Sequence, residues 1–412
     1  MQTVIVGAGI AGLDIADKLI AAGTPGKSII VIERNGYVGG RVITSKKHHV
    51  EIGAGRIHDA HKMVHGLLKR FKIQTIPTSG TSEFRRLGIS KSRPNAFELA
   101  WPAIATLLGR LSYNELSSYT IRELLHRILG AKQADALLME FPYRAEVDMI
   151  RADMGLRAFD ESEGSVGSSE GYSVVRGGLS TLTHALQRHL EKHGVRFQFN
   201  TIVTDVITDV DACEHGCQSI VKIKGGPSLK TNRVILAIPA TALRALPVLH
   251  DHSILTLVGM SPLTRIYATY PEVTWFGSKK LVTDSPLRYI IPVGPTTLMI
   301  SYTDGPDTKT YRGLKGASLQ TAIQRDLRLL FPERTIPEPT WIEAYEWSDG
   351  TTVWKPGSYD PAQQGKAMLQ PKPSAMPNLF VCGESFSEKQ AWIEGALEHA
   401  ELLWTTHLSA SV

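Results

Sequence analysis

The chain has 412 residues, of which 42% are hydrophobic and 21% charged, with a formal net charge of +5. This composition is typical of a globular enzyme that buries a large core in two domains, and it excludes disordered and fibrous classes. The positive excess is small, and no run of Lys and Arg is interleaved with aromatic residues. We therefore expect no binding of nucleic acid.

The beginning of the chain predicts strand, turn, helix and strand. Gly7, Gly9 and Gly12 form a G-x-G-x-x-G turn directly after one apolar run, and Glu33 ends the next apolar run. This order is the fingerprint of a dinucleotide site. Gly7 permits the tight turn, Gly9 lets backbone amides approach a pyrophosphate, and Gly12 lets the helix pack closely on the strand. Glu33 is expected to accept hydrogen bonds from a ribose.

The remaining elements follow from apolar periodicity and from Gly and Pro breaks. Residues 95–156 read as mostly helical, and a serine- and glycine-rich stretch at 162–171 reads as a flexible connection. Further helices are expected at 10–22, 58–71, 179–193 and 319–330, and strands at 195–199, 202–210, 266–269, 281–282, 289–291 and 298–300.

Two further expectations concern targeting and metals. Met1 stands almost directly before the first strand, and no apolar run approaches the ~20 residues that span a bilayer, so we expect a cytoplasmic protein without a membrane partner. Whether it forms a homodimer stays open. Three cysteines are too few for a disulfide framework. Cys213 and Cys217 flank His215 in an expected hairpin tip, but a metal would need a fourth ligand, so no metal site is expected.

Four separated segments resemble motifs of the flavin-containing amine oxidase superfamily. Residues 36–41, GYVGGR, are similar to its second phosphate loop, and residues 175–179 to its central glycine pair. Residues 234–239 are similar to the strand that follows, and residues 378–384 with 391–396 to the closing flavin segment. The motifs come in family order and cover almost the whole chain. The resemblance implies FAD as the cofactor.

The resemblance also implies which residues contact FAD. Val203 falls where the family places a backbone contact to adenine, and Gly383 with Glu384 where a strand reaches the ribityl chain. Some relatives attach the flavin through a cysteine, but Ser358 stands at that position, so the FAD is expected to be non-covalent. The expected cofactor-binding residues are Gly7, Gly9, Ile10, Ala11, Gly12, Glu33, Arg34, Gly40, Arg41, Gly53, Ala54, Gly55, Arg56, Val203, Gly383, Glu384, Trp392 and Ile393.

The expected fold class is α/β, α+β overall. A Rossmann-like FAD-binding domain is combined with a discontinuous substrate-binding domain of mixed sheet plus helices. Residues 1–75, 170–255 and 370–412 are expected to form the first domain. Residues 76–169 and 256–369 are expected to form the second, with its helical part at 95–156.

Arg56 is the sharpest indication of the substrate. In the family its segment lines the flavin, and L-amino-acid oxidases carry G-x-M-R there, with an Arg that grips the substrate carboxylate. The match is partial because this sequence has Gly55 in place of the Met and His58 in place of a Pro. A guanidinium suits the task because its planar fork donates two parallel charge-assisted hydrogen bonds. The alternative is that Arg56 holds a flavin phosphate or a neighbouring acid.

Three more side chains are expected at the reaction centre. Trp392 takes the place where the family sets an aromatic residue against flavin and substrate, its alternative being a core residue, and Tyr359 would form the second wall of an aromatic slot. Arg265 stands where relatives carry a Lys near the flavin; it keeps the charge but cannot shuttle protons near neutral pH. The usual tyrosine partner of the carboxylate-binding Arg falls nearer Ile291, with Tyr289 two residues away, which weakens the carboxylate hypothesis.

The resemblance implies oxidation of the C–N bond of an amino group by hydride transfer to the flavin, with an L-amino acid favoured. Oxygen as acceptor would give hydrogen peroxide, ammonia and a keto acid or aldehyde. The base is not identified, and His58, His61 and His65 are candidates by proximity in sequence only. A simple amine or polyamine oxidase, a phytoene-type desaturase or isomerase, and a non-catalytic flavoprotein stay open as alternatives.

Overall fold

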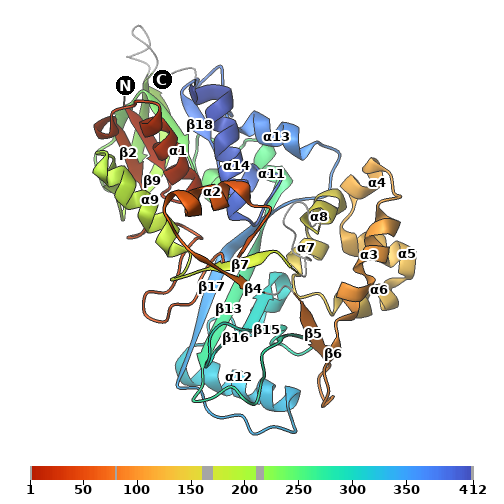
Figure 1. Ribbon diagram of the computed structural model, residues 1–412. Helices are drawn as coiled ribbons and strands as arrows, with labels where there is room; N and C mark the ends of the chain where they lie inside the picture. Colours follow the sequence, from red (N-terminus) through yellow and green to blue (C-terminus); the bar gives the residue numbers. More distant parts are fainter. Residues whose placement is uncertain (1, 79–80, 160–169, 210–217, 410–412) are drawn as a thin grey trace. The chain divides into compact units, whose positions relative to one another are not determined.

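The computed structural model describes residues 2–78, 81–159, 170–209 and 218–409 (Figure 1). The chain divides into two compact units, each assembled from separate segments. The first unit comprises Met1–Pro77, Ser173–Val258 and Tyr359–Val412, and the second comprises Thr78–Tyr172 and Gly259–Ser358. The three residues weighed as metal ligands (Cys213, His215 and Cys217) and most of the expected connection at 162–171 lie outside the described residues.

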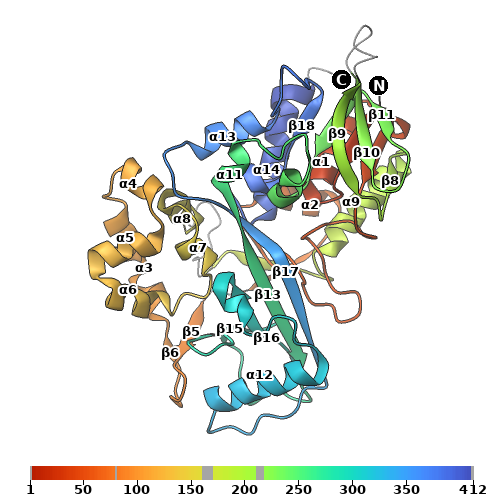
Figure 2. The ribbon, with the colours of Figure 1, turned by 180° about the vertical axis from the view of Figure 1, so that it is seen from behind.

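A parallel sheet forms the centre of the first unit. Within the described residues its order is β18-β12-β1-β2-β8, and every neighbouring pair is parallel. Figure 2 labels its two outer strands, β18 and β8. All side chains of β1 and β2 are buried, as expected for apolar strands covered on both faces. The strands are β1 (Thr3–Val6), β2 (Ile29–Ile32), β8 (Arg196–Gln198), β12 (Arg233–Leu236) and β18 (Leu379–Val381).

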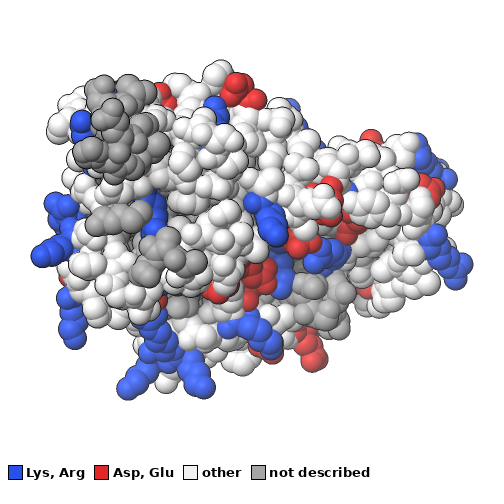
Figure 3. All heavy atoms as spheres, turned by 90° about the horizontal axis from the view of Figure 1, so that it is seen from above, with Lys and Arg blue, Asp and Glu red and all other residues white. Residues whose placement is uncertain are grey.

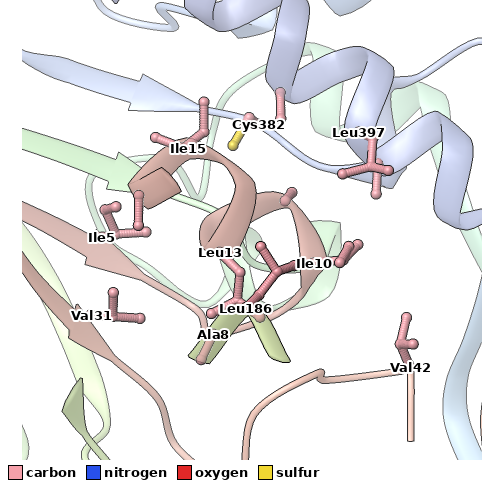
Figure 4. Packing of buried hydrophobic residues seen from close by; sticks show 14 of the residues in the cluster. Ile5, Ala8, Ile10, Leu13, Ile15, Val31, Val42, Leu186, Cys382 and Leu397 are labelled. Carbon is pink, nitrogen blue, oxygen red and sulfur yellow. The ribbon is translucent and has the colours of Figure 1, made fainter. Parts of the chain in front are cut away.

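Helix α1 (Ile10–Ala21) packs between this sheet and two other helices, α9 (Ser180–Lys192) and α14 (Ile393–Leu403). Leu13 lies near Ile5 of β1 and Leu186 of α9 (Figure 4). Cys382 and Leu397 belong to the same core and lie on the side of α1 that faces α14. The packing is tight enough to require Gly12, since a Cβ there would lie 2.1 Å from the Gly7 carbonyl oxygen. The sequence pattern thus fixes both the core face of α1 and its distance from the sheet.

The other elements of the first unit frame this core. A three-stranded sheet has the order β11-β10-β9, and β3, β7 and β4 form another. The bounds are β3 (Ile57–His58), α2 (Lys62–Arg70), β4 (Thr75–Thr78), β7 (Tyr172–Val175), β9 (Val203–Asp209), β10 (Gln218–Ile223), β11 (Leu229–Thr231), α10 (Ala240–Arg244), α11 (Ile254–Leu257), α13 (Pro361–Met368) and the 3₁₀ turn η5 (Glu384–Phe386).

Two expectations for this unit differ from the structure. The helix expected at 58–71 starts only at Lys62, because His58 ends strand β3 and the backbone N–H of His58 donates to Nδ1 of His61 in an intervening turn. The third segment of the unit starts at Tyr359 instead of residue 370, because α13 packs on α14 through a contact between the Gly365 carbonyl and His399.

The second unit contains a mixed seven-stranded sheet with the order β17-β13-β16-β15-β14-β5-β6, counted over the residues that the structure describes. Helix α12 (Gly316–Leu330) covers one face, where its apolar side chains join a core with Ile266, Ile290 and Ile300. The strands are β5 (Ser82–Arg85), β6 (Arg93–Pro94), β13 (Val258–Thr269), β14 (Lys280–Thr283), β15 (Tyr289–Pro292), β16 (Thr297–Asp304) and β17 (Trp341–Trp354).

The helical part of the second unit has its own core, in which the rings of Phe97, Trp101, Phe141 and Phe159 pack against one another. Two of its short helices begin with capping boxes, Ser112 with Glu115 and Thr120 with Glu123, which satisfy the first backbone N–H groups. The helices are α3 (Ala96–Leu108), α4 (Tyr113–Ser118), α5 (Ile121–Leu129), α6 (Ala131–Leu138), α7 (Ala145–Asp148) and α8 (Ala152–Ala158).

Three further observations concern membrane spans, metal sites and surface charge. Among the described residues, no helix is both long and apolar enough to pass through a bilayer, and no group of three or more His, Cys, Asp or Glu side chains is arranged to hold a metal. On the face drawn in Figure 3, Lys and Arg side chains are interspersed with Asp, Glu and uncharged residues.

Candidate functional site

The glycine turn leaves an open space in front of helix α1. Gly7 has φ +106°, and a Cβ there would lie 2.3 Å from the carbonyl oxygen of Ala237, so this position requires glycine. Gly9 precedes the helix with φ −70°, and a Cβ there would meet nothing within 4 Å. The helix has neither a side-chain cap nor an acidic residue in its first turn. Its first N–H groups and its positive dipole end thus suit the pyrophosphate of a dinucleotide.

Glu33 fixes the turn from the end of β2. One carboxylate oxygen accepts the backbone N–H of Ala8 at 3.0 Å, and the other accepts that of Asn35 at 2.9 Å. The side chain is buried, yet each oxygen keeps a second lone pair that can accept a ribose hydroxyl. Of the other expected cofactor residues nearby, Arg34 is exposed and Val203 is half-buried in β9.

Glu384 connects segments from both ends of the chain. Arg41 Nη2 lies 2.6 Å from one of its carboxylate oxygens, and the backbone N–H of Ala391 donates to the other at 2.6 Å. Gly383, just before it, has φ +132°, and Ala391 itself has φ +68°, a conformation that costs energy for a residue with a side chain. The structure thereby brings the second glycine loop and the segment before Trp392 together.

Arg56, His61 and Trp392 form a second cluster in the same unit. The Arg56 guanidinium carbon lies 5.8 Å from the centroid of the Trp392 ring, and the His61 ring meets Trp392 edge-on at 4.7 Å. His61 is fully buried, whereas Arg56 and Trp392 are half-buried. Sequence reasoning named Arg56 and Trp392 independently, and the structure brings them together.

The hydrogen bonds of the histidines define their protonation. Backbone N–H groups can only donate, so Nδ1 of His61 and Nδ1 of His58 act as acceptors for His58 and Ala60, respectively. The neutral rings therefore carry their proton on Nε2. The Nε2 of His65 lies 3.1 Å from the His58 carbonyl and donates to it. In this arrangement neither His58 nor His61 offers a vacant nitrogen lone pair to a substrate ammonium.

Sequence reasoning missed the roles of two glutamates that hold these segments, buried Glu394 and half-buried Glu51. Glu394 accepts the backbone N–H groups of Met63 and Val64 at 2.8 and 3.0 Å, which caps α2 from α14. Burial raises the pKa of Glu394 above its ordinary value. Glu51 accepts Thr44 Oγ1 and the backbone N–H of Leu179, the latter from the glycine-pair segment. The available signal for Glu394 was an acid two residues after Trp392. No local pattern marked Glu51.

In the second unit, Arg265 belongs to a row of aromatic side chains. It lies opposite Tyr302 in the pairing of β13 with β16, and Tyr302 lies opposite Tyr289 of β15. The Arg265 guanidinium carbon is 5.6 Å from the Tyr302 ring centroid, and Tyr143 packs edge-on against both tyrosines. Burial raises the pKa of Tyr302 far above its ordinary value, so this ring stays neutral. The tyrosines of this row were not singled out from sequence as a group.

Two other expected positions are now located. The register of β15 and β16 shifts between Tyr289 and Ile291, and Ile291 pairs with Met299. Tyr359, proposed as an aromatic wall, donates its hydroxyl to the Leu257 carbonyl at 3.2 Å, which anchors it within the first unit.

Comparison with known proteins defines the class. Residues 10–402 match the family of flavin-containing amine oxidoreductases, and the chain belongs to this family. It is therefore a flavin-dependent amine oxidase.

Among characterised relatives, L-amino-acid oxidases from Siganus canaliculatus and Crotalus adamanteus are each 23% identical to it. These alignments cover 97% and 96% of this chain and 84% and 85% of those proteins. A solved putrescine oxidase variant with redesigned cofactor binding superposes over 100% of this chain and 99% of its own, with a TM-score of 0.78 and 16% identity, a likeness of fold.

Proposed function

We propose that this enzyme holds FAD non-covalently and oxidises the C–N bond of an L-amino acid, passing the electrons to oxygen. The products would be hydrogen peroxide, ammonia and a keto acid. The observation that carries the proposal is the pairing of Arg56 with Trp392, which puts a cation and an aromatic face side by side next to the expected flavin segment. The similarity to L-amino-acid oxidases over nearly the whole chain supports the same substrate class.

Different residues of the chain would bind different parts of the cofactor. The open N-terminus of α1 at Gly9 would take the pyrophosphate, and Glu33 the adenosine ribose. Glu384, held by Arg41, would face the ribityl chain. When bound, the flavin supplies the hydride acceptor, and the protein supplies position and electrostatics. Ser358 is exposed and is not a residue that attaches flavin, which supports non-covalent binding.

Arg56 would fix the substrate by its carboxylate. A guanidinium makes two parallel hydrogen bonds to a carboxylate, which sets the orientation of the α-carbon as well as its charge. Trp392 would then bound the space in which the reacting C–H bond lies, since a hydride donor must be held at near-attack distance. His58 and His61 carry their proton on Nε2, so we propose that they hold the turn before α2 and do not remove the proton of the substrate ammonium.

A simple amine is the second candidate. It is favoured by Ile291, which has no hydroxyl to share a carboxylate with Arg56 at the place where L-amino-acid oxidases are expected to supply a tyrosine. Release of peroxide with a panel of amines and amino acids would also separate both candidates from a phytoene-type desaturase and from a flavoprotein without activity.

The deciding experiment compares an L-amino acid with its decarboxylated amine. Arg56→Ala should lower kcat/KM for the amino acid by a factor that corresponds to about 2–5 kcal/mol of transition-state stabilisation, because it leaves a desolvated carboxylate unpaired. The same variant should change kcat/KM for the amine far less. Arg56→Lys is the matched control, since it keeps the charge and loses the planar fork. Equal losses of kcat/KM on both substrates, or loss of bound FAD, would show that Arg56 supports cofactor binding or the fold. The simple amine would then be the better candidate.

A further inference from the structure

His399 of helix α14 lies behind the expected flavin segment. It is buried, its Nδ1 accepts the backbone N–H of Gly383 at 3.2 Å, and its Nε2 lies 3.1 Å from the carbonyl oxygen of Gly365 in α13. An N–H can only donate and a carbonyl can only accept, so the ring is neutral and carries its proton on Nε2. One nitrogen therefore serves the flavin segment, and the other serves the neighbouring helix.

The N–H that His399 holds belongs to the peptide bond directly before the turn at Gly383, which leads into Glu384. Gly383 has φ +132°, in a region that residues with side chains rarely adopt, and the chain turns there into η5. Glu384 follows directly and bonds to Arg41 and to the Ala391 N–H. A rotation of the Gly383 peptide would therefore displace the carboxylate that joins both flavin segments.

We propose that His399 is a positioning residue for the flavin: its Nδ1 orients the Gly383 peptide and thereby the Glu384 carboxylate. This inference rests on the proposed function, in which Gly383 and Glu384 reach the ribityl chain. The surroundings keep the ring in the required state, since burial lowers the pKa of His399 to about 4. At neutral pH the acceptor on Nδ1 is therefore always present.

The alternative role is structural, in which His399 only fastens α13 through the Gly365 carbonyl. That contact is close-packed, because a Cβ on Gly365 would lie 2.4 Å from the Phe386 carbonyl oxygen and 3.7 Å from His399 Nε2. The two roles use different nitrogens of one ring. They can be separated by substituting His399 with an amide side chain that takes over the hydrogen bond of only one ring nitrogen.

The experiment compares His399→Asn with His399→Gln. The Asn amide oxygen can take the place of Nδ1 and accept from Gly383, whereas the Gln amide nitrogen can take the place of Nε2 and donate to Gly365. We expect His399→Gln to weaken FAD binding about tenfold, the effect of one lost hydrogen bond, and to shift the visible flavin spectrum. His399→Asn should stay within about twofold of the wild-type affinity. Thermal melting of each apoprotein measures the structural part separately.

Equal FAD affinities in the two variants, whether both unchanged or both lowered, would overturn the assignment. Gly383→Ala is the independent check if a His399 variant does not fold, because it strains the turn, leaves the ring intact and should also weaken FAD binding; unchanged affinity there would equally refute the inference. A wild-type protein that binds no FAD would instead refute the proposed function. The two failures are therefore distinguishable.

Discussion

Gly9→Ala separates cofactor binding from folding at the glycine turn. The added methyl group would point into space where no protein atom lies within 4 Å, and the φ of −70° and ψ of 172° at Gly9 suit alanine. The apoprotein should therefore keep its stability or gain about 0.4–1 kcal/mol, because alanine has less conformational freedom in the unfolded chain.

The same methyl group would occupy the place expected for the pyrophosphate. Hydrogen bonds from backbone N–H groups to a charged phosphate are worth about 1.5–3 kcal/mol each, and pushing the phosphate away should weaken at least one. We expect FAD affinity to fall by about 2–4 kcal/mol, roughly 30-fold to 1,000-fold. Isothermal titration of the apoprotein with FAD, together with its thermal melting, measures both quantities.

Gly12→Ala is the matched control. Its Cβ would lie 2.1 Å from the Gly7 carbonyl oxygen and 3.2 Å from the Ala237 side chain, so the helix would have to move from the sheet. This variant should destabilise the apoprotein itself by about 1–3 kcal/mol. Unchanged FAD affinity in Gly9→Ala would show that the pyrophosphate does not bind in front of α1.

Local spacing was sufficient to predict the glycine turn. Gly7, Gly9, Gly12 and Glu33 lie within one strand, turn, helix and strand unit, so their geometry depends on neighbours in sequence. The fold class followed in the same way, since buried apolar strands that alternate with amphipathic helices predict a parallel sheet. Arg41 and Glu384 lie 343 positions apart; the family resemblance named each as a cofactor-binding residue, but their contact was not predicted.

Other features depend on tertiary contacts that the sequence pattern does not encode. Strand β17 was not expected, because polar and aromatic residues are mixed along it and it lies at the edge of its sheet. The row of Arg265, Tyr302 and Tyr289 depends on strand register, and an irregularity near Tyr289 shifts that register. The tautomer of His61 is set by one backbone N–H in a turn that the sequence had predicted to be helical.

Three further predictions concern the cofactor, a helix cap and pH. Acid precipitation should leave intact FAD in the supernatant, and yellow colour retained in the pellet would contradict the interpretation of Ser358. Glu394→Ala removes the acceptor for two N–H groups at the start of α2 and should cost about 1–2 kcal/mol in urea unfolding of the apoprotein, whereas Glu398→Ala, one turn along the same helix and more exposed, should cost less. The pKa of buried His399 is about 4 when folded and its ordinary value is 6.5, so the unfolded chain takes up this proton first as the pH falls. The free energy of unfolding should therefore be insensitive to this group above pH 6.5 and should decrease between pH 6.5 and 4, by at most about 3 kcal/mol. Urea unfolding of the apoprotein at pH 7 and 4.5 checks this, with His399→Asn as the reference that lacks the titration; a difference between wild type and variant that is the same at both pH values would refute the burial argument.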